Sequence, residues 1–237
     1  MRNAVSANDF VPYELDDLGV IIPHSNLNPN RWAWFWPQFR AATPDAVLRN
    51  TIVVYHQRDG KPASIPDNVQ AIEIAGSTLL VLEREGQSIV WPFKLGLESI
   101  KTRIVTRIAN DVEICDPGWA QKVIEIYNEP PHLKILAMLT APGLAYDKIK
   151  HFCNTPWVER LLHHGDYDAM DYYHGSIIIA NRAIWRAYYP EVAALTRHDT
   201  EDILFTLFSR ADGVPVVPWG AQLFRHRGPT GQDVILP

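Results

Sequence analysis

The stretch Ile104-Val105-Thr106-Arg107-Ile108-Ala109-Asn110-Asp111-Val112-Glu113-Ile114 decides the fold predicted for this chain. Its apolar and β-branched residues predict a buried strand, and its acidic residues gather toward the carboxyl end. In open α/β sheets, ligands bind outside the carboxyl ends of the strands. Carboxylates such as Asp111 and Glu113 at that position suit a hard divalent cation bound to a phosphorylated ligand. The alternative is an ordinary turn, because Asn and Asp often end a strand.

On both sides of this stretch, strand-like and helix-like segments alternate. The predicted strands, besides 104–114, are 18–23, 51–55, 69–74, 133–139, 174–179, 214–218 and 222–224. The predicted helices are 28–42, 119–128 and 199–209, the first of which Pro37 should kink or shorten. This order predicts an α/β fold with a mostly parallel central sheet flanked by helices. We expect one domain over residues 1–237, with 143–173 as an insertion on the acceptor side of a ligand site.

Composition and charge narrow the class of protein. The chain of 237 residues is 47% hydrophobic and 21% charged, as in ordinary globular proteins. A net charge of −5 argues against binding nucleic acid through bulk charge. The two cysteines, Cys115 and Cys153, provide neither a disulfide framework nor a cysteine zinc site, which favours a cytoplasmic location. We expect no membrane span and no signal peptide, because no apolar run is long enough and residues 1–17 carry acids.

Two aromatic regions have open interpretations. The aromatic residues between 32 and 39 fit a buried core better than a ligand platform. The insertion 143–173 mixes basic and aromatic residues, including His163-His164, Trp157 and Tyr167. Such a surface suits unpaired nucleotides, sugar rings or the packing of a lid.

Four groups of residues follow one another in a familiar order. They are Val20-Ile21-Ile22-Pro23; Asn110-Asp111-Val112-Glu113 with Pro117-Gly118-Trp119; Gly175-Ser176-Ile177-Ile178-Ile179 with Asn181-Arg182-Ala183-Ile184-Trp185; and Glu201-Asp202 with Gly213–Pro218 and His226. Together they resemble the GT-A fold glycosyltransferases, especially the family 2-like nucleotide-sugar enzymes. Their counterparts there are the first strand, the DxD strand end with its PGW helix, the RR-x-x-[FW] helix, and the ED helix with a terminal His. Trp91-Pro92-Phe93-Lys94 and Ile100-Lys101-Thr102 also resemble the exostosin-like branch.

The resemblance implies a metal-dependent hexosyltransferase. It would move a sugar from a nucleoside diphosphate-sugar, expected to be a UDP-sugar, to a hydroxyl acceptor, with inversion and with Asp202 as general base. Glu201 would orient the site or bind the acceptor, and the exostosin-like features would permit retention instead. The implied metal is Mn²⁺ or Mg²⁺, with ligands from Asp111, Glu113 and His226. The implied donor-binding residues are Pro23, His24, Ser25, Arg58, Asp59, Asn110 and Arg225.

The implied sugar transfer from a nucleoside diphosphate needs a metal site and a base, and carboxylates can serve as both. A divalent cation stabilises the charge of a departing diphosphate, and a carboxylate within hydrogen-bond reach can take the acceptor's proton. One departure from the family pattern is Ala109, which stands where the first acid of the DxD motif is expected. Without that acid, the chain lacks a side chain that the family pattern would use for the ribose contact and for metal affinity.

More than one interpretation is open for the acceptor and for the activity. The acceptor would be a glycan, a small molecule or DNA carrying hydroxymethylated pyrimidines. The DNA version corresponds to virus-encoded relatives, such as those of bacteriophages, and would place the protein in the host cytoplasm; the acidic net charge does not favour it. A second alternative, supported by Ala109, is a nucleotide-sugar-binding protein without catalytic activity.

Overall fold

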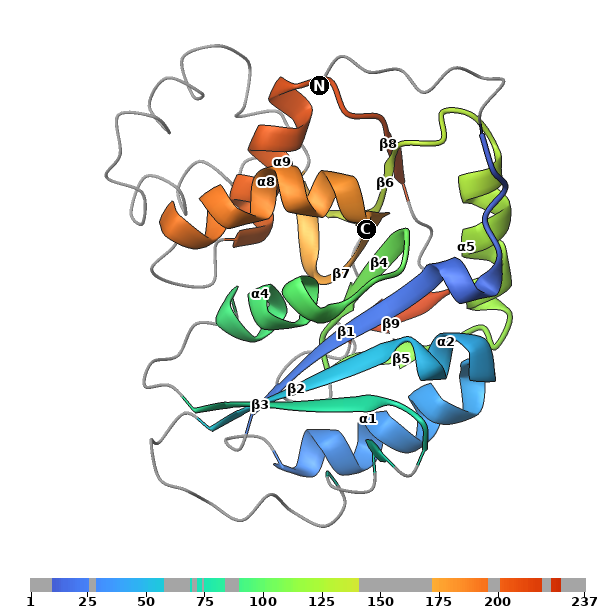
Figure 1. Cartoon of the computed structure of the whole chain (residues 1–237), viewed down its shortest axis with the longest axis vertical. Helices are drawn as coiled ribbons and strands as arrows, with labels where there is room; N and C mark the ends of the chain where they lie inside the picture. The colour runs from blue at the N-terminus through green and yellow to red at the C-terminus, as the bar shows by residue number, and fades with distance from the viewer. Residues whose placement is uncertain are drawn as a thin grey trace.

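The computed structural model describes residues 10–25, 29–57, 69, 72–73, 75–83, 90–140, 172–195, 201–218 and 223–226. Its strands are β1 Leu18–Ser25, β2 Thr51–Gln57, β3 Thr78–Glu83, β4 Ile104–Ile108, β5 Val112–Ile114, β6 Ile135–Thr140, β7 Tyr172–Asn181, β8 Val216–Pro218 and β9 Phe224–His226. Its helices are the 3-10 helix η2 Leu15–Asp17 and the α-helices α1 Pro29–Ala42, α2 Asp45–Arg49, α4 Val90–Ser99, α5 Trp119–Asn128, α8 Arg182–Leu195 and α9 Glu201–Ala211. Figure 1 shows their arrangement in space.

The described strands form a seven-stranded sheet in the order β3-β2-β1-β4-β7-β6-β8. β1 pairs in parallel with β2 and β4, and β3 extends the parallel part beyond β2. β7 runs antiparallel to both of its neighbours, β4 and β6, while β8 is parallel to β6. β5 and β9 form a separate antiparallel pair. The prediction of an α/β fold with a mostly parallel sheet flanked by helices is therefore confirmed.

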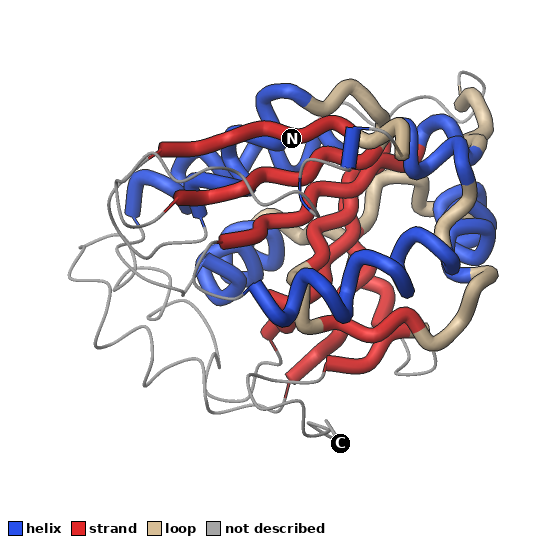
Figure 2. Tube along the Cα trace, turned by 90° about the horizontal axis from the view of Figure 1, so that it is seen from below, coloured by secondary structure: helices blue, strands red, loops and turns tan. Residues whose placement is uncertain are grey.

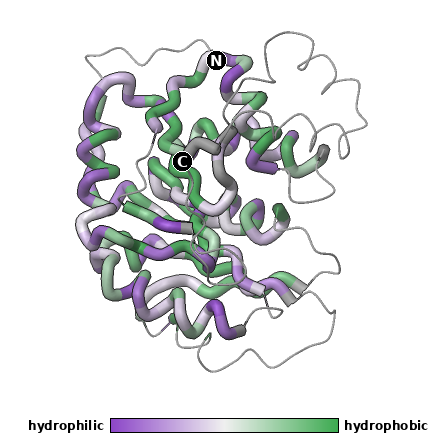
Figure 3. Tube along the Cα trace, turned by 180° about the vertical axis from the view of Figure 1, so that it is seen from behind, coloured by the Kyte–Doolittle hydropathy of each residue, from purple (hydrophilic) through white to green (hydrophobic). Residues whose placement is uncertain are grey.

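Helices cover both faces of this sheet (Figure 2). Alternate strand residues point to opposite faces, so Val105 and Ile21 pack with α4, α8 and α9, on what we call the α8 face. Ile104 and Ile108 pack on the other face with α1, α2 and α5, which we call the α1 face. The hydrophobic colour in Figure 3 accordingly concentrates on the central strands.

The aromatic cluster of α1 belongs to the α1 face. Trp32, Phe35, Trp36 and Phe39 are buried in its core, as expected for a core cluster, while Trp34 is 43% exposed. Of the two effects expected of Pro37, a kink or a shorter helix, the second does not occur, because α1 continues to Ala42 with this proline inside it.

Two strand predictions were wrong. The described residues of 69–74 are not in a strand: Val69, Ile72 and Glu73 are helical, and β2 pairs with β3 on the side away from β1. Val69 and Ile72 are both buried, and their spacing of three residues suits a helical turn as well as a strand. The predicted strand 104–114 is in fact divided into β4 and β5, because the chain turns at residues 109–111.

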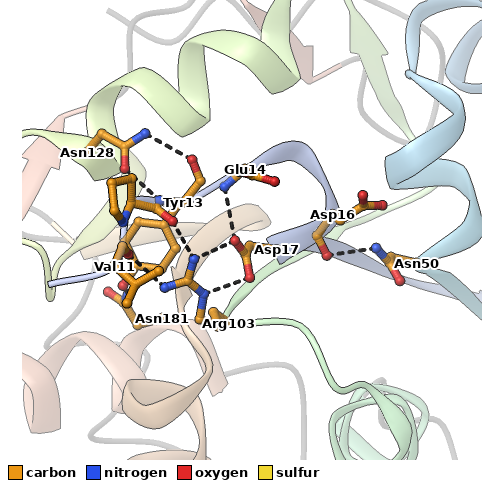
Figure 4. Close-up of polar contacts among 10 residues, drawn as sticks. Val11, Tyr13, Glu14, Asp16, Asp17, Asn50, Arg103, Asn128 and Asn181 are labelled. Carbon is orange, nitrogen blue, oxygen red and sulfur yellow. Dashed lines mark hydrogen bonds and ion pairs between the residues drawn. The ribbon is translucent and has the colours of Figure 1, made fainter.

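The amino-terminal segment is held at the opposite end of the sheet from the carboxyl end of β4 (Figure 4). The Arg103 guanidinium donates to both carboxylate oxygens of Asp17 at 2.6 and 2.5 Å, and to the carbonyls of Val11 and Pro12 at 2.9 and 2.6 Å. It also lies 4.3 Å from the centre of the Tyr13 ring. We call this group of contacts the Arg103 clamp.

Asn128 and Asn181 complete the attachment of Tyr13. The Tyr13 backbone exchanges two hydrogen bonds with the Asn128 side chain, and Asn181 Nδ2 donates to the Tyr13 hydroxyl at 2.9 Å. The amino-terminal segment is thereby tied to α5 and to the end of β7.

Candidate active site

Three of the residues predicted to bind a donor, His24, Ser25 and Asn110, lie at the carboxyl end of β1 and just after β4. β1 extends beyond its predicted end at Pro23, so that His24 and Ser25 pair with Tyr55 and His56 of β2 rather than forming a loop. On the other side, the Ala109 N–H donates to the Ser176 carbonyl of β7 at 2.7 Å. This bond joins the chain just after β4 to the middle of β7.

A buried hydrogen bond connects the end of β1 to the turn after β4. Asn110 Nδ2 lies 2.9 Å from His24 Nδ1, and an amide nitrogen can only donate. Nδ1 is therefore the acceptor, and Nε2 carries the proton of the neutral ring. Burial lowers the pKa of His24 to about 4, and the ring packs beside Trp32 and Tyr55, so it is neutral near pH 7.

Asp111 lies in the turn after β4 and Glu113 lies in β5, and each has its own cationic partner. The Asp111 carboxylate, 15% exposed, is 3.4 Å from Arg31 of α1. Glu113, within β5, is 3.7 Å from Arg225 of β9. Because β4 ends at Ile108, strand alternation does not relate the two acids.

The β5–β9 pair also braces the turn that carries Asp111. Val112 pairs with His226 and Ile114 with Phe224, while Gln38 of α1 bonds to the backbone of Val112 and Ile114 at 3.3 Å each. The backbone of His226 thus lies close to the turn; its side chain is outside what the structure describes, as are Arg58 and Asp59.

The described side chains fit one kind of metal site. Within the described part of the chain, no three His, Cys, Asp or Glu side chains cluster as a complete metal site. Mg²⁺ and Mn²⁺, however, bind through one or two carboxylates and take further oxygens from phosphates and water. Asp111, an oxygen ligand beyond the carboxyl end of β4, meets that requirement.

The amino terminus of α9 is fastened to the start of β7. Asp202 Oδ2 accepts the Gly175 N–H at 3.1 Å, and Asp202 Oδ1 accepts the N–H of Ile203 at 2.8 Å. A β-carbon at position 175 would lie 2.8 Å from Asp202 Oδ2, so this approach requires glycine. Thr206 adds a second attachment, since its hydroxyl accepts the Tyr173 N–H at 2.9 Å.

Glu201 is buried and paired with Arg107. The two side chains are 3% and 2% exposed and form an ion pair between α9 and β4. Burial is the largest single influence on Arg107 and lowers its pKa, but the charge and hydrogen bond of Glu201 act together with Tyr189 and Asp202 to raise it, and the pKa of Arg107 is raised overall. Sequence reasoning did not single out Arg107; the available signal was a charged residue inside an otherwise apolar strand.

The fold has counterparts among solved structures. Staphylococcus aureus TarS 1–349 in complex with UDP-GlcNAc is 14% identical with a TM-score of 0.56, over 87% of this chain and 57% of that one. The mannosyltransferase PcManGT from Pyrobaculum calidifontis, in complex with GDP-Man and Mn²⁺, is 14% identical with a TM-score of 0.54, over 87% of this chain and 55% of that one. The chain has the GT-A glycosyltransferase fold.

This GT-A chain aligns with little more than half the length of those two chains. Its sequence matches no protein-family model and no curated protein. None of the helices in the described ranges is long and apolar enough to cross a membrane.

Proposed function

We propose that the chain is a glycosyltransferase that moves a hexose from a nucleoside diphosphate-sugar, a UDP-sugar in the first instance, to a hydroxyl acceptor. One observation carries the proposal. The Ala109–Ser176 hydrogen bond brings the turn with Asn110 and Asp111 next to Gly175, whose N–H binds Asp202. Residues suited to hold a donor diphosphate and a residue suited to take a proton are thus gathered at one edge of the sheet.

Asp202 is the proposed general base. The hydrogen bonds that it accepts from the N–H groups of Gly175 and Ile203 fix its carboxylate, and a carboxylate can take the proton of an acceptor hydroxyl. The side chain is intermediate in exposure, so an acceptor can reach it. As the hydroxyl attacks the anomeric carbon, its proton passes to Asp202 and the bond to the diphosphate breaks. A single displacement of this kind inverts the anomeric carbon.

Asp111 is the proposed protein ligand of Mn²⁺ or Mg²⁺, with Glu113 and His226 as further candidates. When bound, the ion supplies charge stabilisation to the diphosphate. Arg225, half-exposed beside Glu113, would add a guanidinium to the same phosphates. Neutral His24 and Asn110, together with Pro23 and Ser25, would line the nucleoside end; Arg58 and Asp59, which follow β2 in the sequence, remain candidates.

The test compares three proteins with UDP-glucose, UDP-galactose, UDP-GlcNAc and GDP-mannose in the presence of Mn²⁺. We expect the wild type to gain melting temperature with one donor and to release its nucleoside diphosphate, detected by mass spectrometry. Asp202→Asn should keep the thermal shift and lose turnover by about 100-fold or more, the range for a general base. Asp212→Asn, an exposed acid at the other end of α9, is the matched control and should behave as wild type.

Each result has a distinct meaning. No thermal shift with any donor would contradict nucleotide-sugar binding. A shift without turnover in the wild type would identify a binding protein without catalysis. Full turnover in Asp202→Asn would remove Asp202 from its role as base.

A further inference from the structure

Arg107 occupies an unfavourable place for a charge. It lies in the five-residue strand β4 and points to the α8 face, where its guanidinium is 5.8 Å from the Phe93 ring. Its hydrogen bond goes to Glu201, whereas Arg107 Nε and Glu201 Oε2 have no hydrogen-bond partner among the described residues. Buried pairs with incomplete hydrogen bonding contribute little net stability, and apolar side chains of similar volume often replace them without loss. Stability alone therefore gives a poor account of this pair.

The pair stands at the first residue of α9. Glu201 is the first residue of the helix and Asp202 is the second, so whatever fixes the Glu201 side chain also limits the position of Asp202. Arg107 fixes it from β4, while the Gly175 N–H and the Tyr173 N–H hold Asp202 and Thr206 from β7. β4 and β7 are themselves paired, with Arg107 opposite Ile178. The start of α9 is thus fixed from two adjacent strands.

We propose that Arg107 and Glu201 are positioning residues that aim the Asp202 carboxylate at the acceptor hydroxyl. The inference rests on the proposed function only because it takes Asp202 as the base. The claim that the pair fixes the Asp202–Gly175 hydrogen bond does not depend on that function. Of the two roles expected for Glu201, the proposal selects orientation of the site, through the helix, over binding of the acceptor. A side chain 3% exposed and paired with a buried guanidinium has little access to a substrate.

The experiment removes both charges together. A single substitution would leave its partner charged and buried, which can prevent folding, whereas Arg107→Met with Glu201→Met replaces the pair by apolar side chains. In this double variant we expect the melting temperature to stay near that of the wild type. The Gly175 amide, measured by hydrogen exchange, should exchange about tenfold faster or more, while amides of β1 and β2 keep their protection.

Turnover provides the second measurement. The kcat of the double variant should fall by about 100-fold, the loss expected when a reacting group shifts by about 1 Å. KM for the donor should stay unchanged, because the donor-binding residues are not altered. Arg107→Lys, which keeps the charge, should recover part of kcat. Arg103→Gln with Asp17→Asn removes an ion pair from the other end of the same strand and should leave kcat and Gly175 exchange unchanged.

The outcomes separate the two proposals. Unchanged Gly175 exchange in a folded double variant would overturn the positioning role, whatever the activity. Faster Gly175 exchange with unchanged kcat would overturn the link to catalysis. If the wild type turns over no donor, the proposed function fails, and Gly175 exchange still decides whether this pair positions Asp202.

Discussion

Two arginines near the ends of β4, Arg103 and Arg107, differ in their exposure to solvent and in how completely their guanidinium groups are hydrogen-bonded. Arg103, just before β4, is 37% exposed and its donors reach a carboxylate and two backbone carbonyls. Arg107, within β4, is 2% exposed and its Nε has no hydrogen-bond partner among the residues described. The well-bonded arginine lies far from the candidate site, and the poorly bonded one lies beside it. The difference indicates that the Arg103 clamp serves stability, whereas the Arg107–Glu201 pair serves geometry.

The largest expected effect comes from breaking the buried pair on one side only. Arg107→Met leaves the Glu201 carboxylate without its partner in the core and should lower the free energy of unfolding by about 3–5 kcal/mol. Urea denaturation measures this directly. The variant with both residues changed to Met should recover most of the loss, and equal stability of the single and double variants would contradict the account.

The second-largest expected effect is a loss of stability in mild acid, caused by His24 at the carboxyl end of β1. The unfolded chain protonates His24 near its ordinary pKa of 6.5, whereas the folded chain resists protonation down to about 4. The His24 contribution is therefore complete above pH 6.5 and is lost as the pH falls toward 4, by roughly 3 kcal/mol in total.

Urea denaturation at several pH values between 4 and 7 measures this loss. His24→Gln cannot titrate and should show a correspondingly flatter dependence. The pKa of Asp17 is lowered mainly by its hydrogen bond to Arg103, and because Asp17 is present in both proteins its contribution cancels in the comparison. Equal slopes for His24→Gln and wild type would show that another group is responsible.

A smaller effect is expected from the Arg103 clamp. Arg103→Gln removes an ion pair that is partly exposed, together with its hydrogen bonds to backbone carbonyls. Such contacts contribute about 1–2 kcal/mol, because water can replace much of what is lost. Thermal or urea denaturation should detect the change, with activity unaffected. A loss as large as that of Arg107→Met would remove the distinction between the two arginines.

The smallest expected effect concerns the Tyr13 hydroxyl. Tyr13→Phe keeps the ring beside Arg103 and removes the acceptor of the Asn181 Nδ2–H. The expected loss is about 1 kcal/mol, the scale of one buried hydrogen bond. Tyr188→Phe is a matched comparison, since the Tyr188 hydroxyl donates to the exposed carboxylate of Asp212, where water can replace it, and its loss should matter less.

Periodicity and motif order predicted most of the fold. Segments such as 119–128 and 51–55 have one strong pattern each, and the structure confirms α5 and β2 there. Residues 69–74 failed because two apolar side chains three apart satisfy both periods. The break within 104–114 could not be placed, since pairing of β5 with β9, more than a hundred residues later, determines where the second strand begins.

The acidic residues of the candidate site could be predicted from the sequence, whereas the residues that hold them in place, such as Arg107 and Gly175, could not. The Glu-Asp pair and the Asn-Asp turn are visible as motifs, and the structure brings Asn110 within hydrogen-bond distance of His24. Arg107 escaped notice because a strand residue reveals its partner only through tertiary packing. The need for glycine at 175 depends on the approach of Asp202, which is equally invisible in one dimension.

The short ladder between β5 and β9 has a practical consequence. A version of the chain truncated before residue 224 would deprive Val112–Ile114 of its pairing strand and expose an unpaired edge immediately after Asp111. Expression trials that trim the carboxyl terminus should therefore retain residues through 226. Otherwise the chain would lose solubility through the unpaired strand and, at the same time, lose Arg225 and His226 from the proposed donor site.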